Sequence, residues 1–275
     1  MAMLTVRELS RRFNDVVALR DVSLTVEEGH VAALLGPSGC GKTTVMRLIA
    51  GLDSPDGGDI MIGGESILNQ PPHRRGVGLM FQELALFPHL NVSQNVEFGL
   101  RMSNWPKQAR TERISELLDL VELSGLGGRH VHELSSGQRQ RVALARTLAP
   151  EPDVLLLDEP LGALDETLKQ ELRIQLRQVL TRLRTTVLIV SHDLRDAVAL
   201  ADDIVVMGNG HILQAGPIPN VLARPETVNV ALMLGYVTIA DGSVQNGRVV
   251  EAGVGSVQIP DELSIGGQVQ VLGHP

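Results

Sequence analysis

The chain has 275 residues, of which 43% are apolar and only 2% aromatic, so a globular core has to be built from aliphatic side chains. The formal net charge of −8 argues against a protein that grips nucleic acid through a broad basic face. The single cysteine, Cys40, excludes an internal disulfide, and no apolar run approaches the roughly 18 residues needed to cross a bilayer. The first residues lack a secretory signal pattern, which predicts a cytoplasmic protein.

The N-terminal region predicts strands followed by a βα unit. From Leu4 to Val26, β-favouring and polar residues alternate, which is typical of antiparallel strands. The apolar run Val31–Leu35 ends at a glycine-rich turn, and a helical pattern follows over Lys42–Ala50, with Gly51 placed to terminate it. Strand, glycine loop and helix in this order make a βα unit.

The middle of the chain predicts an alternation of strands and helices around a helical insertion. Gly76–Phe81 is expected to be a strand, and the segment from about Ser93 to Ala149 is helical, with Pro106 as a helix start and Gly125–Gly128 as a break. Strands then follow at Asp153–Leu157, Thr186–Val190 and Ile204–Met207, and helices at Glu166–Arg184 and Asp193–Ala201. This alternation predicts a largely parallel sheet covered on both faces.

After about Gly235 the composition changes to glycine, valine and glutamine. Asn246 and Gly247 form a hairpin-type turn signal, and Val269–Val271 alternates like a strand. We expect residues 236–275 to form a small β-rich regulatory module, either reduced or truncated, and too short to hold much core of its own.

A phosphate-binding loop follows the first apolar strand. The pattern of a glycine, four residues and then Gly-Lys-Thr is met by Gly36, Pro37, Ser38, Gly39, Cys40, Gly41, Lys42 and Thr43, with Thr44 next in the chain. The glycines let backbone N–H groups point inward, and the following helix presents its positive end to phosphate. Lys42 can reach the outer phosphates and the Thr43 hydroxyl can hold Mg²⁺. A chance match in a turn is the alternative, but the strand before and the helix after both fit.

Two acids end the apolar run that begins at Val154. Asp158 would lie at the carboxyl edge of the sheet, where it can take part in metal coordination through water. Glu159 beside it can orient or deprotonate an attacking water. Many strands end in an acid before a loop, so this pattern indicates a catalytic site only in combination with the phosphate loop.

Five further segments resemble ABC ATPases and occur in that family's order. They are Gln82 of the Q-loop, Leu134–Gln138 of the signature, Arg139–Ala143 that continues it, Ala163–Asp165 of the D-loop and the switch histidine His192. Phe13 lies where the family places an aromatic ring under the adenine. The resemblance covers roughly residues 3–235. It implies an α/β fold, a P-loop NTPase ABC-type nucleotide-binding domain at 1–235, with an antiparallel β subdomain, a helical subdomain at about 83–150 and the small C-terminal β appendage.

The resemblance also implies that two such domains meet head to tail, each ATP lying between one phosphate loop and the other copy's signature. Ser135 and the Gly137 N–H would then contact the γ-phosphate, and the helix beginning near Gln138 would aim its positive end at the same anion. A homodimer of this chain is the expected assembly.

Within one copy, the resemblance assigns the hydrolytic roles to the sheet edge. Glu159 would be the general base, His192 would contact the γ-phosphate, and Mg²⁺ would be held by Thr43, Gln82 and Asp158. Gln82 would also relay the nucleotide state to a membrane partner. ATP and Mg²⁺ are therefore the expected cofactors of an ATPase.

Several positions leave alternatives open. Ser136 replaces the glycine that the family usually has, and is either tolerated with its side chain pointing away or weakens closure of the dimer. Phe13 could belong to the core, and Cys40 is either a small filler or a thiol with a lowered pKa near a helix N-terminus. We interpret the charge run Arg173–Arg184 as a solvated helix face.

Segments beside Gln82 resemble the importer branch of the family, which includes sugar, polyamine, ferric-iron and sulfate or molybdate systems. They are Leu86–Leu90 and Asn95–Leu100, which in that branch form a groove for a permease helix. Details around Gly128–Leu134 and Leu148–Pro152 favour ferric iron or polyamine as cargo, with sugar, sulfate, molybdate or thiamine as alternatives. Membrane permease subunits and, indirectly, a solute-binding protein are the expected partners, and the expected location is the cytoplasmic face of the membrane, as a peripheral subunit.

Two readings from other classes compete with the importer. An ABC ATPase acting on nucleic acid or the ribosome usually carries two cassettes, a long coiled coil or basic extensions, none of which this acidic chain shows, so no nucleic-acid partner is expected. A regulatory module without catalysis is disfavoured by the intact Lys42, Asp158, Glu159 and His192.

Overall fold

The computed structural model describes residues 3–162, 166–183, 185–245, 248–251, 255–258 and 267–273. The chain divides into two compact units, Met1–Val221 and Leu222–Pro275, and each is described by itself. All of the candidate site residues fall within the first unit. The sequence places the change of composition later, after Gly235, which lies inside the second unit.

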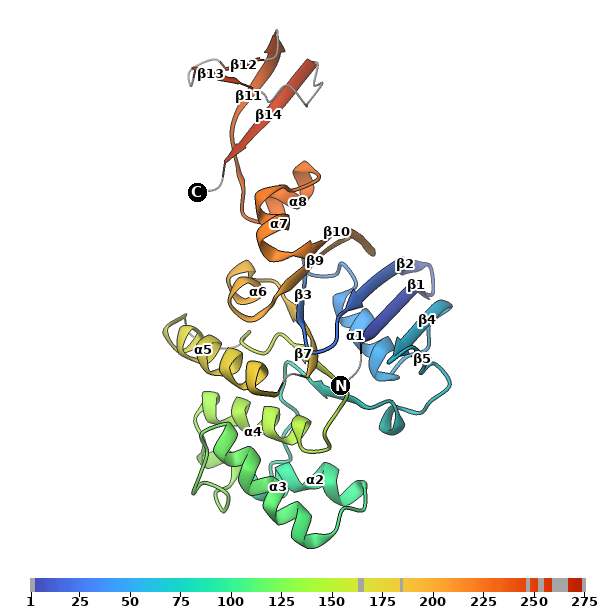
Figure 1. Ribbon diagram of the computed structural model, residues 1–275, viewed down its shortest axis with the longest axis vertical. Coiled ribbons are helices and arrows are strands. Elements are labelled where there is room, and N and C mark those ends of the chain that lie inside the picture. Colours follow the sequence, from blue (N-terminus) through green and yellow to red (C-terminus); the bar gives the residue numbers. More distant parts are fainter. Residues whose placement is uncertain are drawn as a thin grey trace. The chain divides into compact units, whose positions relative to one another are not determined.

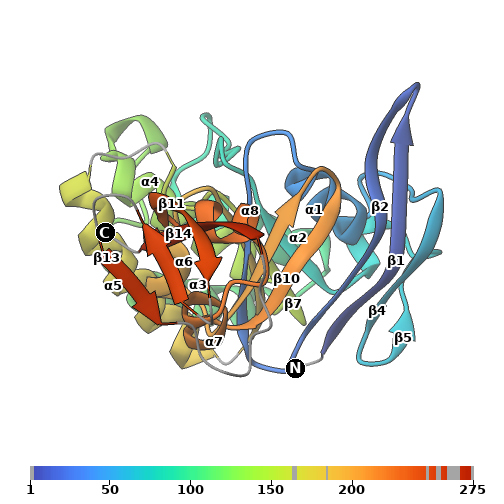
Figure 2. The ribbon, with the colours of Figure 1, turned by 90° about the horizontal axis from the view of Figure 1, so that it is seen from above.

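An antiparallel sheet opens the first unit. Its strand order is β2-β1-β4-β5, with β1 at Leu4–Phe13, β2 at Val16–Val26, β4 at Gly57–Ile62 and β5 at Glu65–Ser66. The antiparallel pairing of the first two strands confirms the prediction from their alternation. The sequence analysis missed β4, since the glycines and the aspartate in its first half are depleted in strands. Figure 2 shows this sheet on the side of the unit away from α4 (Ser136–Leu148) and α5 (Glu166–Leu183).

A second sheet carries the predicted parallel strands. Its order is β10-β9-β3-β8-β7-β6, formed by His211–Pro217, Asp203–Gly208, Val31–Leu35, Thr186–Ser191, Val154–Asp158 and Val77–Met80. All pairs are parallel except β10 with β9. The central strands are nearly continuous apolar runs because both faces of the sheet are buried.

The edge strand β10 was not predicted, although the chain carries its signal. Asn209 and Gly210 form the two-residue connection between β9 and β10, and both have positive φ, 49° and 80°. Asn-Gly is the preferred sequence for such a hairpin turn. The following strand is half exposed, which weakened the alternation that would have marked it.

The helices confirm the predicted insertion. The remaining helices of the first unit's body are α1 at Lys42–Ala50, α2 at Val92–Met102, α3 at Lys107–Leu120 and α6 at Leu194–Leu200. Figure 1 shows α2, α3 and α4 gathered together beyond the parallel sheet. Pro106 is the residue before α3, and Gly51 ends α1 in a left-handed conformation, both as predicted. No helix in the described part of the chain is long and apolar enough to cross a membrane.

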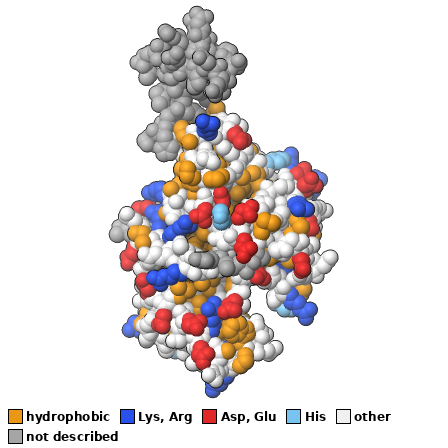
Figure 3. Space-filling view, viewed as in Figure 1, with side chains coloured by type: hydrophobic (Ala, Val, Ile, Leu, Met, Phe, Trp, Pro, Cys, Tyr) orange, Lys and Arg blue, Asp and Glu red, His pale blue; other side chains and the backbone are white. Residues whose placement is uncertain are grey.

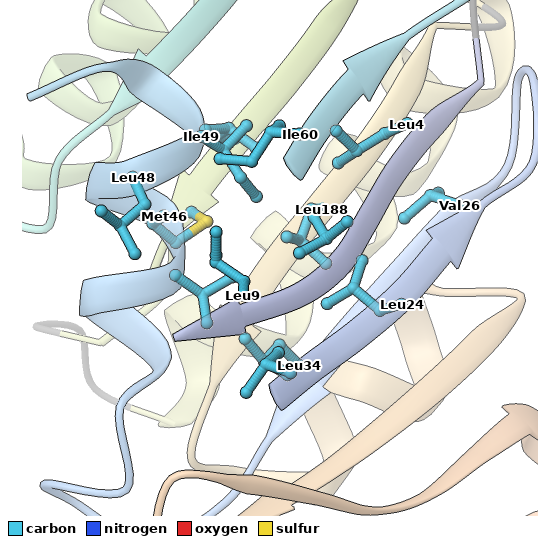
Figure 4. Packing of buried hydrophobic residues seen from close by; sticks show 14 of the residues in the cluster. Leu4, Leu9, Leu24, Val26, Leu34, Met46, Leu48, Ile49, Ile60 and Leu188 are labelled. Atoms are coloured by element: carbon cyan, nitrogen blue, oxygen red, sulfur yellow. The ribbon is translucent and has the colours of Figure 1, made fainter. Parts of the chain in front are cut away.

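The main core lies between the antiparallel sheet, α1 and the parallel sheet. Figure 4 shows Leu9 of β1, Met46 of α1 and Leu34 of β3 within this cluster, and each is at most 1% exposed. Truncating a buried leucine to alanine in such a core costs about 2–5 kcal/mol. The aliphatic packing fixes α1 against the sheet and so fixes the loop from which α1 starts.

The second unit combines short helices with a small sheet. Helix α7 (Ile218–Ala223) spans the division between the units, and α8 is Val228–Met233. Its described strands are antiparallel in the order β13-β12-β11-β14, at Gly255–Gln258, Arg248–Glu251, Val237–Gln245 and Gly267–Gly273. The strand predicted around Val269–Val271 is therefore confirmed, whereas the turn predicted at Asn246 and Gly247 lies outside the described residues.

Candidate active site

Three parallel strands end side by side at one edge of the sheet. Leu35 of β3 pairs with Ser191 of β8, and Asp158 of β7 pairs with Val190 of β8. The segments that leave these strands therefore start next to one another. One is the phosphate loop, the next begins with Glu159, and the third begins with His192. Ligands bind at this carboxyl edge in open α/β sheets.

The phosphate loop opens into an uncapped helix. Gly41 is the N-cap residue of α1 with φ of 107°, and no side chain caps the helix start. A Cβ at Gly41 would lie 2.7 Å from Leu19 Cδ2 and 2.8 Å from Ala18 O, so glycine is needed for space as well as for conformation. An uncapped N-terminus leaves backbone N–H groups and the positive end of the helix for an anion.

The interior of the loop is filled by Lys42, which is 6% exposed. Its Nζ donates to Gly36 O at 2.7 Å and to Pro37 O at 2.9 Å, so the ammonium group lies inside the curl of the loop. Cys40 is also buried, with Sγ 3.8 Å from Nζ. A Cβ at Gly36 would lie 2.8 Å from this sulfur, so the small Cys40 side chain fills the space that the loop leaves.

The outer surface of the loop is open. Pro37, Ser38, Gly39 and Thr43 are exposed, and Thr44 is half-buried. Phe13, at the end of β1, is 39% exposed, with the Arg11 guanidinium 4.7 Å from the ring centroid. That exposure excludes the core alternative for Phe13 and leaves its ring available for stacking.

Glu159 lies at the centre of a small polar cluster. Its Oε2 accepts a hydrogen bond from Gln82 Nε2 at 2.9 Å, and its Oε1 lies 3.0 Å from His192 Nδ1. The residue has φ of 46°, a conformation that side-chain-bearing residues rarely adopt, and such strain concentrates at functional sites. The structure thus joins three residues that are far apart in the sequence and that were predicted to act together.

The surroundings of Asp158 disfavour a negative charge on its carboxyl group. Burial raises the pKa of its carboxyl group, the negative charge of Glu159 raises it further, and Lys42 opposes both effects. A positive charge placed near this carboxylate would relieve the repulsion. The Thr43 hydroxyl belongs to the adjacent first turn of α1 and is exposed.

The signature segment forms the start of α4. Ser135 is its N-cap: the Ser135 hydroxyl accepts from the Gln138 N–H, and the Gln138 side chain accepts from the Ser135 N–H. Gly137 is buried, whereas Ser136 is exposed. Ser136 also lines a cavity of about 310 Å³ together with Gln82 and Glu159.

The described residues of one chain do not assemble all the predicted parts. No hydrogen bond or ion pair among them joins Ser135, Gly137 or Gln138 to the phosphate loop. The predicted D-loop residues, Ala163–Asp165, lie outside the described residues.

The comparisons with known proteins decide the family. A family model described as ABC transporter matches residues 19–162. The chain belongs to the ABC transporter family. It is 44% identical over 258 residues to the sulfate/thiosulfate import ATP-binding protein CysA of Gloeobacter violaceus, covering 94% of this chain and 75% of that one. It is 42% identical over 244 residues to the Fe(3+) ions import ATP-binding protein FbpC 1 of Haemophilus influenzae, covering 89% and 74%.

Solved ABC structures share the fold. The ATP-binding cassette MJ0796, in a dimeric post-hydrolysis state bound to ADP and Pi, matches with a TM-score of 0.68 and 28% identity over 78% of this chain and 98% of that one. These findings confirm the predicted α/β P-loop fold. They also confirm that this member of the ABC family is an ATP-binding, ATP-hydrolysing subunit of the importer kind.

The interpretation of Arg173–Arg184 as a solvated face was wrong at its first residue. Arg173 is 8% exposed, because it lies on the buried stripe of α5 with Leu172, Leu176 and Val179. The helical spacing of these apolar residues was a signal that could have found it. Arg146 of α4 was also missed: it donates to Leu84 O and Ala85 O, two residues with positive φ in the loop after Gln82.

Proposed function

We propose that this ABC ATPase hydrolyses ATP between two copies of the chain, and that hydrolysis drives uptake of a small inorganic ion through separate membrane permease subunits. The position of Glu159 carries the proposal. Its carboxylate lies between Gln82 and His192 at the carboxyl edge of a parallel sheet. That is where a general base has to lie to activate water beside a phosphate held at the start of α1.

The phosphate loop binds the triphosphate in this proposal. The binding residues are Gly36, Pro37, Ser38, Gly39, Cys40, Gly41, Lys42, Thr43 and Thr44. Lys42 exchanges its bonds to loop carbonyls for bonds to the outer phosphates, because an ammonium group interacts more strongly with phosphate than with a neutral carbonyl. Phe13 stacks on the adenine, and its exposed ring supports this role.

Mg²⁺ fits the residues at the sheet edge. The Thr43 hydroxyl, the Gln82 side chain and the Asp158 carboxylate are oxygen donors of the kind that this ion prefers. The raised pKa of Asp158 supports a nearby cation, because burial and Glu159 disfavour the carboxylate in its absence. When bound, the ion would neutralise charge on the phosphate oxygens.

The second copy supplies Ser135, Gly137 and Gln138. The dimeric state of the solved relative supports a head-to-tail homodimer, in which the start of α4 faces the γ-phosphate. His192 contacts the same phosphate from the first copy. Loss of the γ-phosphate on hydrolysis removes the bridge between the two chains and loosens the dimer.

Ferric iron is the cargo we favour, and sulfate or thiosulfate is the second candidate. Relatives named for each of these ions match this chain at 41–46% identity. The partners are membrane permease subunits and, through them, a solute-binding protein, with this subunit peripheral at the cytoplasmic face. Residues 1–235 form the nucleotide-binding domain, and residues 236–275 form a short β-rich regulatory module in this proposal.

The substitution Glu159→Gln tests the catalytic assignment. The amide keeps the shape of the side chain but cannot accept a proton, so we expect kcat for ATP hydrolysis to fall by at least ~10²-fold. The Kd for ATP, measured by calorimetry, stays close to that of the native chain, and light scattering shows a dimer with ATP but not with ADP. The exposed Glu65→Gln is the matched control with normal kcat. Near-normal turnover in Glu159→Gln would mean that another residue is the base.

Uptake of radiolabelled ferric iron and radiolabelled sulfate separates the two cargos. Deletion of the gene in the source organism should reduce uptake of only one ion, and the native gene should restore it while Glu159→Gln should not. Loss of sulfate uptake alone would replace ferric iron by the second candidate.

A further inference from the structure

A partly buried cluster of charges lies next to the turn of His192, between α5 and α6. Arg173 of α5 donates from Nε to Asp196 Oδ1 at 2.6 Å and from Nη1 to Glu166 Oε1 at 3.0 Å. Its Nη2 lies 3.7 Å from Asp193 Oδ2. One guanidinium group therefore contacts the first residue of α5, the first turn of α6 and the residue that follows His192.

A hydroxyl group connects this cluster to the turn that carries His192. Ser191, the last residue of β8, is 3% exposed. Its Oγ accepts from the Asp193 N–H at 3.0 Å and lies 3.4 Å from Asp196 Oδ2 as a donor. Asp193 is therefore held at its N–H by this hydroxyl and at its carboxylate by Arg195, with the Arg173 guanidinium as a further charge contact.

The imidazole itself has little packing to orient it. The His192 side chain is 53% exposed, and its interaction among the described residues is the 3.0 Å contact with Glu159. Its position depends on the backbone of the turn, since surrounding side chains cover less than half of it. A shift of this backbone by even 1 Å would misplace the imidazole relative to a phosphate and to Glu159.

The electrostatics of the cluster agree with a firmly held turn. Burial opposes the charge on Arg173, but the hydrogen bonds that it donates to Asp196 and Glu166 outweigh this effect and raise the pKa of the guanidinium. Burial likewise opposes ionisation of Asp193, but hydrogen bonds and charge from Arg195 and the charge of Arg173 lower the pKa of this carboxyl. Arg173 and Asp193 are thus both favoured in their charged forms.

We propose that Arg173 is a positioning residue for ATP hydrolysis, which holds the turn around His192 through Asp193 and Asp196 and so keeps His192 against Glu159. The inference rests on the proposed roles of His192 and Glu159. Stability alone does not explain the cluster, because replacing a buried ion pair by apolar residues of similar volume is often neutral or stabilising.

The same helix provides a matched control. Arg177 lies one turn after Arg173 on α5 and donates to Asp202 Oδ1 at 2.7 Å and to Leu200 O at 2.7 Å. Leu200 is the last residue of α6 and Asp202 follows it, so both acceptors lie away from His192. The variant Arg177→Met therefore removes an ion pair between α5 and the segment after α6 without touching the turn.

Steady-state ATP hydrolysis and calorimetric ATP binding by the full chain test the inference. For Arg173→Met we expect kcat to fall by about 10- to 100-fold, the range expected when a catalytic group is misplaced. The Kd for ATP should change by less than about two-fold, since the phosphate loop is intact. Arg177→Met should keep kcat within about two-fold of the native value. Normal turnover in Arg173→Met would overturn the inference.

A double variant separates positioning from stability, because Arg173→Met leaves Asp196 buried without its partner. Arg173→Met with Asp196→Leu replaces both charges by apolar groups and should recover the melting temperature. We expect its kcat to stay low, because the contacts of the guanidinium with Asp193 and Glu166 are still missing. Recovery of kcat together with the melting temperature would reduce Arg173 to a structural role.

The variant His192→Ala distinguishes failure of the positioning inference from failure of the proposed function. Full turnover in His192→Ala would overturn the assigned role of His192 itself. Loss of turnover in His192→Ala beside normal turnover in Arg173→Met would leave the proposed function standing and overturn the positioning inference alone.

Discussion

Two helix N-termini in this molecule, both proposed to bind the same phosphate, are built in opposite ways. Helix α1 starts at Gly41 without any side-chain cap. Helix α4 starts at Ser135 with a complete capping box, in which Ser135 and Gln138 satisfy each other's N–H groups. The first end offers its N–H groups to an anion at once. The second has to exchange an internal hydrogen bond for one to the ligand.

From this difference we expect that one chain binds ATP without closing the dimer. The α1 end carries the buried Lys42 and needs no rearrangement of a cap to accept phosphate. An N-cap hydrogen bond contributes about 1 kcal/mol, so opening the box offsets part of what the second contact gains. We therefore expect binding to depend mainly on α1, and dimerisation to depend on α4.

The largest effect on ATP affinity is expected from Lys42→Ala. Losing charge-assisted bonds worth about 1.5–3 kcal/mol should weaken ATP binding by roughly 10- to 100-fold, measured by calorimetry. Lys169→Ala removes a partly exposed ammonium group from α5 and serves as the matched control with unchanged affinity. An unchanged affinity of Lys42→Ala for ATP would show that phosphate does not bind at the uncapped N-terminus of α1.

Ser135→Ala should act on the dimer rather than on binding by one chain. In the Glu159→Gln background we expect the ATP-driven dimer to weaken by about 5- to 30-fold, or ~1–2 kcal/mol. This is less than the ~1.5–3 kcal/mol of one hydrogen bond to a charged group, because the native chain gives up a capping bond to make it. The melting temperature should fall as well, because the cap is lost. Asn91→Ala breaks the equivalent capping box of α2 and should lower only the melting temperature. Equal weakening of the dimer by both variants would remove Ser135 from the phosphate contact.

Asp158, at the same edge of the sheet as the phosphate loop, lowers the stability of the fold to an extent that depends on pH. Because the folded-state pKa of Asp158 is raised, stability is lost as pH rises from the usual aspartate value of about 3.9 through the folded pKa. Asp158→Asn should therefore raise the melting temperature at pH 7, with a gain that shrinks as pH falls toward 4. Thermal melts of both proteins across this range test the sign, and a gain that does not change with pH would contradict it.

The phosphate loop and α1 could be predicted from the sequence better than the contacts around Glu159, for a physical reason. Local spacing dictates a phosphate loop, and Lys42–Ala50 was predicted with the bounds that α1 has. The contact of Glu159 with Gln82 and His192 depends on strands from three parts of the chain; the family resemblance, not the spacing, brought these residues together. Arg173 was misread because a charge pattern along one helix says nothing about what another helix presents to it.

The smallest effect is expected at Ser136, the first residue of α4, where the family has glycine. The side chain is exposed, and it lines the same cavity as Gln82 and Glu159 of its own chain. Since it takes no part in the capping box, Ser136→Gly should change the ATP-driven dimer of the Glu159→Gln background by less than about three-fold, equivalent to ~0.6 kcal/mol.

Glycine in the first turn of α4 should also lower the melting temperature slightly, because it loses about 0.5–1 kcal/mol more conformational freedom on folding than alanine does. Sedimentation of both proteins with ATP, with ADP and without nucleotide measures the dimer directly. A dimer strengthened more than about ten-fold by Ser136→Gly, or ~1.4 kcal/mol, would mean that the serine side chain obstructs closure. Closure of the dimer at the start of α4 would then be limited by the bulk of Ser136 as well as by the hydrogen bonds of the capping box.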